Sequence, residues 1–245
     1  IVVEGFFFDE LTSELSRSKI ALRSFAEVSS KMDVKANLLT TLQVNRLKHL
    51  IENGVPFEEA QSQSISEVLA LFNIPSTDIS EFTAMDIAGS ADSDAILLAA
   101  SVILMQMATD MSPNSPVAKL ALILAQMSTD IETDGAIDPA SANYKQIGIS
   151  SQNANLPVIR SNLVNIYASL GLVITPSNFE NYVDSDRDGD LQDDPFFTSS
   201  TAVNLSENTT VTGYTAIATD ADGDTPTFSL TGGPEQSSFS IDATS

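Results

Sequence analysis

The chain of 245 residues is strongly acidic, with 33 Asp and Glu against 11 Lys and Arg and a formal net charge of −22. Such a charge repels phosphate backbones and anionic lipid, which excludes nucleic acid and membrane surfaces as expected partners and favours divalent cations. There is no Cys, so disulfides, thiol catalysis and thiolate metal sites are excluded, while a hydrophobic fraction of 42% is enough for a packed core.

Residues 1–29 are predicted to form a short β segment. Two runs rich in β-branched and aromatic residues, "IVVEGFFF" and "KIALRSFAEV", flank the polar stretch "DELTSELSRS". This is the pattern of a hairpin-like strand pair. Because the first run begins directly at Ile1, we expect this segment to be the end of a β module that precedes it.

Residues 30–182 are predicted to form an α-helical bundle of about five helices. Leucines recur at helical spacing in "ANLLTTLQVNRLKHLIENG", which stops at Gly54, and the next run opens with Pro56 and acids in its first turn. Two further helices are expected, one opening near Pro116 and one in "LPVIRSNLVNIYASLG", which ends on a glycine. Short connections between such helices are typical of a compact bundle.

The stretch "SADSDAILLAASVILMQMAT" is predicted to be the central helix of this bundle, because it is apolar on nearly all sides. Ser90 or Asp92 is the expected N-cap. Its apolar run, residues 95–108, is shorter than the ~20 residues that cross a bilayer, and acids flank it. We therefore expect a buried core helix and no transmembrane segment.

An Asp-rich linker over residues 183–195 and an antiparallel β-sandwich over 196–245 are predicted to follow. The runs "TVTGYTAIATD", "TPTFSLTGG" and "SFSIDATS" read as short strands separated by turns. The chain stops after about half of such a sandwich, so we expect it to continue past Ser245 or to be completed by strands from elsewhere. The expected fold class is a multi-domain α + β protein.

The linker carries the strongest metal signal. "DSDRDGDLQDD" places Asp184, Asp186 and Asp188 at positions 1, 3 and 5 of a loop, a glycine at 6 and Asp190 at 7. Alternating carboxylates around a Gly turn converge on a hard cation, so the spacing favours a calcium loop over a solvated acidic linker. An EF-hand loop would need Glu at position 12, where Pro195 stands; the pattern resembles thrombospondin type 3 repeats more closely.

The segment after the loop resembles the bacterial cadherin family over about 50 residues. "DDPFF" is similar to the linker that opens a cadherin repeat, "NLSEN" contains a Glu at the place of the family's first-strand glutamate, and "AIATDADGDTPTFSLTGG" matches its Asp-Ala-Asp pattern. The resemblance implies a calcium-binding sandwich with ligands Asp193, Asp194, Glu207, Asp220 and Asp222. An ordinary Asp-Gly turn is the alternative for Asp220 and Asp222.

A third acidic stretch, "DIETDGAID" at residues 130–138, has a similar spacing but Ser141 at position 12. Here we favour a helix end at Gly135 and a helix start at Asp138-Pro139 over calcium. His49 has no partner signal, and the sequence contains no nucleophile elbow, phosphate-binding Gly loop or zinc motif. We therefore expect no enzyme.

Parts of the helical region, such as "VEGFFFDELTSELS" and "DAILLAASVIL", resemble a module of large bacterial surface proteins. The sequence thus predicts a non-enzymatic segment of an extracellular, calcium-binding modular adhesin, in which calcium rigidifies the linker between helical and cadherin-like domains. The alternative is a subunit of a surface filament or sheath completed by strand exchange. Expected partners are other domains of the polypeptide, neighbouring copies, and a cell-surface protein or glycan, for which the bundle would need an aromatic-lined pocket.

Overall fold

The computed structural model describes residues 1–25, 34–74, 76, 79–183, 196–197, 199, 215–219 and 228–229. The chain divides into two compact units, Ile1–Gly189 and Asp190–Ser245. The described residues combine α-helices with short antiparallel strand pairs, so the chain is a mixed α and β protein, as expected.

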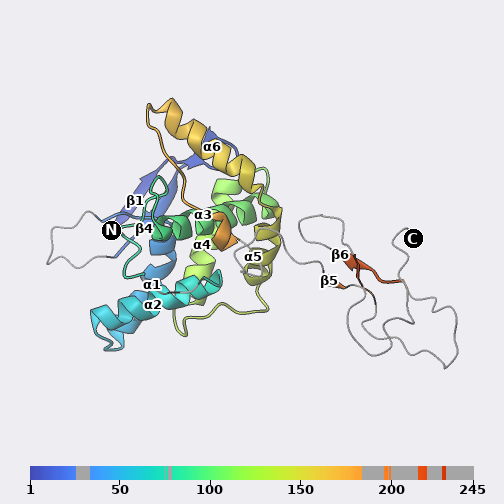
Figure 1. Ribbon diagram of the computed structural model, residues 1–245. Coiled ribbons are helices and arrows are strands. Elements are labelled where there is room, and N and C mark those ends of the chain that lie inside the picture. Colours follow the sequence, from blue (N-terminus) through green and yellow to red (C-terminus); the bar gives the residue numbers. More distant parts are fainter. Residues whose placement is uncertain are drawn as a thin grey trace, which may run out of the picture. The chain divides into compact units, whose positions relative to one another are not determined.

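Unit 1 begins with two nested antiparallel strand pairs (Figure 1). The outer pair is β1 (Val2–Gly5) with β4 (Ile20–Arg23), and the inner pair is β2 (Phe8–Asp9) with β3 (Glu14–Leu15). The outer pair confirms the predicted strand pairing. The inner pair was not predicted, because it lies largely in a polar run; the Asp9 carboxylate accepts the Leu11 N–H at 2.9 Å, and Ser13 adopts a φ of 61° at the turn.

The strands belong to the same unit as the helices that follow. Ile20 of β4 is buried in the main hydrophobic core. At the end of β4, the Arg23 N–H donates to Thr41 Oγ1 at 2.9 Å and the Thr40 hydroxyl donates to the Arg23 carbonyl at 2.8 Å. These bonds satisfy backbone groups on the side of β4 that faces away from β1 and join it to the first helix.

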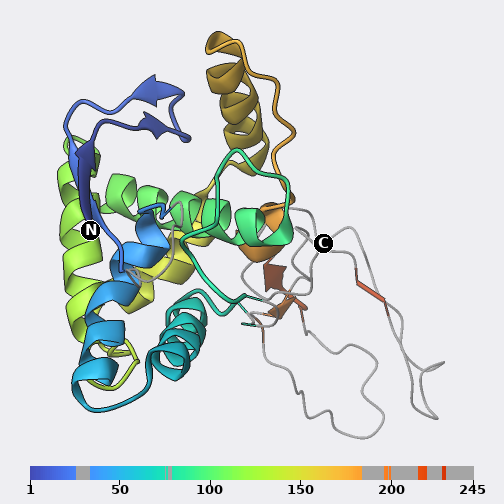
Figure 2. The same cartoon turned by 90° about the vertical axis from the view of Figure 1, so that its left-hand side faces the viewer.

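Seven helices follow in the described part of unit 1. They are α1 (Leu38–Glu52), α2 (Phe57–Leu71), α3 (Asp92–Met111), α4 (Pro116–Asp130), α5 (Ala142–Asn153), α6 (Leu156–Ser169) and α7 (Glu180–Val183). Helix α3 is central, since it packs against α1, α4, α5 and α7. Figures 1 and 2 show α3 in green running through the middle of the helices, while α6 projects at the edge of the unit.

Helix α3 is buried on nearly all sides, as its composition predicts. Leu98, Ala99 and Leu104, which point in different directions around the helix, are all fully buried. By length and composition α3 is the one helix in the described residues that could cross a membrane, and 72% of its most apolar window is buried inside the protein. That burial fits the expected core helix.

Helix ends follow the predicted glycines but not the predicted N-cap of α3. Gly54 and Gly171 follow α1 and α6 with φ of 89° and 76°, the left-handed conformation that ends helices. The N-cap of α3 is Ala91, not Ser90 or Asp92. Asp94 takes over the capping role, because its carboxylate accepts the Ala91 N–H at 3.0 Å and the Asp86 N–H at 2.8 Å.

For helix α5 the sequence indicated only an approximate start, because the helix has almost no apolar face. Its two buried residues are Asn143 and Ser150. It is held to α3 by polar contacts instead: one oxygen of Asp110 accepts the Ser150 hydroxyl at 2.8 Å and the Asn153 amide at 3.0 Å. A helix attached in this way shows no hydrophobic period in its sequence.

In unit 2, β5 (Phe196–Phe197) pairs antiparallel with β6 (Ala218–Thr219). The Ser199 N–H donates to the Ile217 carbonyl at 3.1 Å and continues this pair by one residue. Apart from Phe228 and Ser229, which are described and do not form a strand, the other strands predicted for the sandwich lie outside the described residues, so the sandwich stays a prediction.

Candidate functional site

All nine predicted calcium ligands lie outside the described residues. They are Asp184, Asp186, Asp188, Asp190, Asp193, Asp194, Glu207, Asp220 and Asp222. Calcium binding by these residues therefore stays a prediction. Within the described ranges, no group of three or more His, Cys, Asp or Glu side chains is arranged to hold a metal ion. The structure does describe the segment that leads into the Asp loop, residues 176–183.

The chain enters the Asp loop from a buried position. Val183, the residue before Asp184, is 2% exposed, and Phe179 is fully buried. Both belong to the main hydrophobic core, and α7 packs against α3. The first predicted calcium ligand is therefore one residue away from a side chain fixed in the core of unit 1.

Arg160 of α6 holds this segment in place through five contacts. Its Nε and Nη2 each donate to the Glu180 carboxylate at 2.6 Å, and its guanidinium lies over the Phe179 ring, 5.4 Å from the centroid. Nη1 and Nη2 donate to the carbonyls of Pro176 and Ser177 at 2.8 and 2.9 Å. The hydrogen bonds to Glu180 raise the pKa of Arg160 above its ordinary value. A bidentate, charge-assisted pair of this kind gives geometric specificity as well as stability.

Sequence reasoning did not find the Arg160 contacts. Arg160 and Glu180 are 20 residues apart and belong to different elements, so no helical spacing relates them. The only sequence signal is the scarcity of cations: the chain has 11 Lys and Arg in all, and Arg160 is the only charged residue of α6.

The stretch "DIETDGAID" forms the end of α4 and the turn after it. This is the structure that the sequence favoured over a calcium-binding loop. Gly135 adopts a φ of 77°, and its N–H donates to the Ile131 carbonyl at 3.0 Å. Its carboxylates accept backbone N–H groups: Asp134 from Ala136, and Asp130 from Asp138, each at 3.0 Å. These bonds already give the acids local partners.

The predicted helix start at Asp138-Pro139 is wrong by a few residues. Helix α5 begins at Ala142, and the Ser141 hydroxyl caps it by accepting the Tyr144 N–H at 3.1 Å. Asp138 and Pro139 instead form a turn, in which the Ser141 N–H donates to the Asp138 carbonyl at 2.9 Å. Pro is favoured at the second position of such a turn as well as in a first helical turn, and here the turn is formed.

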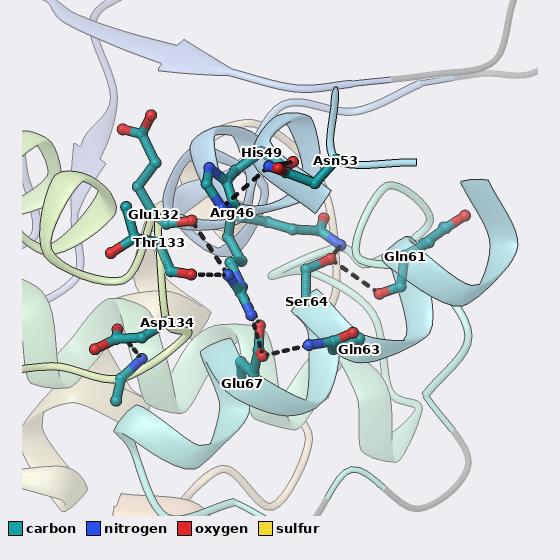
Figure 3. A network of polar contacts seen from close by, with 12 residues as sticks. Arg46, His49, Asn53, Gln61, Gln63, Ser64, Glu67, Glu132, Thr133 and Asp134 are labelled. Atoms are coloured by element: carbon teal, nitrogen blue, oxygen red, sulfur yellow. Dashed lines mark hydrogen bonds and ion pairs between the residues drawn. The ribbon is translucent and has the colours of Figure 1, made fainter. Parts of the chain in front are cut away.

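A buried ion pair fixes the loop after α4 against α1 and α2 (Figure 3). Arg46 Nε and Nη2 donate to the two oxygens of Glu67 at 2.7 and 2.8 Å, and the Arg46 side chain is only 6% exposed. Arg46 Nη1 donates to the Thr133 carbonyl at 2.6 Å. The bonds to Glu67 raise the pKa of Arg46. His49, one turn along α1, lies beside the amide of Asn53 and is not part of this pair.

A hollow of about 620 Å³ lies along α2 and is acidic. Its lining includes the carboxylates of Glu58, Glu59 and Glu67 and, among its named lining residues, no aromatic side chain. Glycan sites are commonly lined by aromatic rings that stack on the sugar, so the lining of this hollow gives no support to recognition of a glycan by the bundle.

Replacing Gly135 by Ala should cost more stability than the same change at Gly54. Both residues have positive φ, which costs Ala about 1–2 kcal/mol. At Gly135 a Cβ would also collide with the Glu67 carboxyl group, whereas nothing lies within 4 Å of one at Gly54. Because Glu67 is held by buried Arg46, we expect Gly135→Ala to lower the free energy of unfolding by about 3 kcal/mol or more. Equal losses in urea denaturation would contradict this account.

Removing the Arg160 guanidinium should loosen the entry to the Asp loop. Arg160→Met leaves Glu180 and two carbonyls without their partner, so we expect a loss of about 2–3 kcal/mol. The matched control is Lys48→Met, which removes an exposed pair with Glu52 and should cost less than about 0.5 kcal/mol. Hydrogen exchange of the Phe179 and Tyr182 amides should accelerate in Arg160→Met alone; unchanged exchange would contradict the anchoring role.

No family model matches the chain, and neither does any curated protein or solved structure. The function is therefore inferred from three features of the chain itself: its charge, the spacing of its aspartates, and the buried segment that leads into them.

Proposed function

We propose that this chain is a non-enzymatic segment of an extracellular, calcium-binding modular adhesin, in which calcium rigidifies the junction between the helical unit and a cadherin-like domain. One observation carries the proposal: the Asp loop follows directly on Val183, a residue buried in the core of unit 1. A loop that is fixed by a bound ion would therefore be attached directly to the core of unit 1.

The distribution of charge supports a cation at this junction. After Arg187 the sequence contains no Lys, Arg or His. Over the same residues it contains ten carboxylates: Asp188, Asp190, Asp193, Asp194, Glu207, Asp220, Asp222, Asp224, Glu235 and Asp242. No basic side chain within this region can neutralise them, so solvent cations must do so. Calcium, which takes six to eight oxygen ligands, suits such a set.

The anchored entry also lowers the cost of binding. An ion that organises a free loop must offset the conformational entropy of every residue that it fixes, about 1–2 kcal/mol each. Here the Arg160 contacts with Glu180 and with the carbonyls of Pro176 and Ser177 already fix the backbone up to the first ligand. Binding then has to order only the residues beyond Val183.

Calcium titration by calorimetry tests this function. We expect the chelator-stripped chain to bind calcium with a Kd on the order of 10⁻⁴–10⁻³ M, as extracellular modules do. At about tenfold excess over Kd, calcium should stabilise the chain by about 1.4 kcal/mol. The double variant Asp186→Asn/Asp188→Asn should lose both effects.

The control is Asp130→Asn/Asp134→Asn, which changes two acids of the other acidic stretch whose carboxylates already accept backbone N–H groups. This control should bind calcium as the unaltered chain does. Absence of calcium binding by the unaltered chain, or equal binding by the Asp186/Asp188 variant, would overturn the proposal.

A further inference from the structure

A second feature of unit 1, independent of the Asp loop, is a carboxylic acid buried without a cation. Glu10 lies in the turn between β2 and β3 and is 4% exposed. The Ser101 hydroxyl of α3 donates to its Oε1. Among the described residues, no Lys, Arg or His forms an ion pair with Glu10. A buried charge without a partner is strongly unfavourable, so the acid belongs in its neutral form.

The hydrogen bonds that join this hairpin to the helices are made at Glu10 and the residue after it. The Asn162 amide of α6 donates to the backbone carbonyls of Glu10 and Leu11, each at 3.0 Å. Leu11 packs against the core, but Phe8 and Leu15 on the paired strands are 40% and 53% exposed. Insertion of Glu10 between α3 and α6 is therefore the central contact of this hairpin.

The groups that face Glu10 from each packed element are neutral or acidic. Ser101 faces it from α3, and Asn162 and Tyr167 face it from α6. Asp9 precedes it on the hairpin, and burial raises the pKa of Asp9 as well. Burial, and the nearby carboxylates Asp86 and Glu10, raise the pKa of Tyr167. The Ser101 hydroxyl and the Glu10 backbone N–H stabilise the ionised form of Glu10, but burial outweighs both of them.

We propose that the β2–β3 hairpin, residues 7–16, is a protonation-controlled arm that docks between α3 and α6 when Glu10 is neutral and is released when Glu10 ionises. Release would expose the apolar side chains of Phe7 and Leu11, which pack against the core in the docked state. The arm would thus respond to pH without any change in the remaining helices.

The direction of the effect follows from linkage. Burial raises the pKa of Glu10 from 4.5 to about 7 in the docked state, while a released hairpin would restore the ordinary value. The docked state then binds the proton more tightly, so docking is strongest below about pH 4.5 and weakens as pH rises through 7. The docking equilibrium constant should fall on the order of 10²-fold between pH 5 and pH 8.

Hydrogen exchange at single-amide resolution tests this arm. The hairpin contains two reporter amides, because the Phe7 N–H donates to Ser16 Oγ at 3.1 Å and the Ser16 N–H donates to the Phe7 carbonyl at 2.7 Å. These bonds lie within the hairpin, but an isolated strand pair is at best marginally stable in water, so both should open when the arm is released. Both amides therefore report docking. After correction for intrinsic exchange, their protection should fall on the order of 10²-fold from pH 5 to pH 8. Protection of α1 amides in the same sample should stay constant, which separates release of the arm from global unfolding.

Two variants assign the effect to Glu10. Glu10→Gln keeps the shape and removes the ionisation, so hairpin protection should become independent of pH. Asp9→Asn, which changes the adjacent acid, should retain the pH dependence. Protection in the unaltered chain that does not vary with pH, or an unchanged pH dependence in Glu10→Gln, would overturn the proposal.

Discussion

The structure of unit 1 depends on the burial of α3. A helix that is apolar on every side gains its stability only when other elements cover its whole circumference. Here α1, α4, α5 and α7 do so, and the buried residues of α3 form the middle of the core. The segment 174–183 therefore returns to α3 and supplies Phe179 and Val183 to the core, which is why the chain leaves unit 1 from a fixed point.

A few arginine side chains hold connecting segments that lie outside the hydrophobic core. Arg46 and Arg160 each form a bidentate pair with one Glu and also bind backbone carbonyls of a connecting segment. Each thereby satisfies carbonyl groups that no helix supplies with partners. Where no cation is available, the fold uses neutral donors around Asp110 and a buried neutral acid at Glu10. In this acidic chain, two basic residues thus hold two connecting segments against the helices.

The sequence predicted the elements whose burial is apolar, and it missed or placed only approximately those whose contacts are polar. The leucine spacing of α1, the all-apolar α3 and the glycines after α1 and α6 are local signals, and each predicted element is present. Helix α5 and the Arg160–Glu180 pair depend on polar contacts between distant segments, which leave no period in the sequence. Of the candidate site, the sequence provides the predicted ligands and the structure provides the buried residue before them.

The most direct test of the central claim is the distance distribution between the two units with and without calcium. Since the chain has no Cys, nitroxide labels can be placed at single exposed positions, Lys145→Cys in unit 1 and Thr215→Cys in unit 2. Calcium-rigidified linkage predicts a broad distribution with chelator that narrows on adding calcium, and no narrowing in Asp186→Asn/Asp188→Asn. A distribution of the same width with calcium and with chelator would contradict the account.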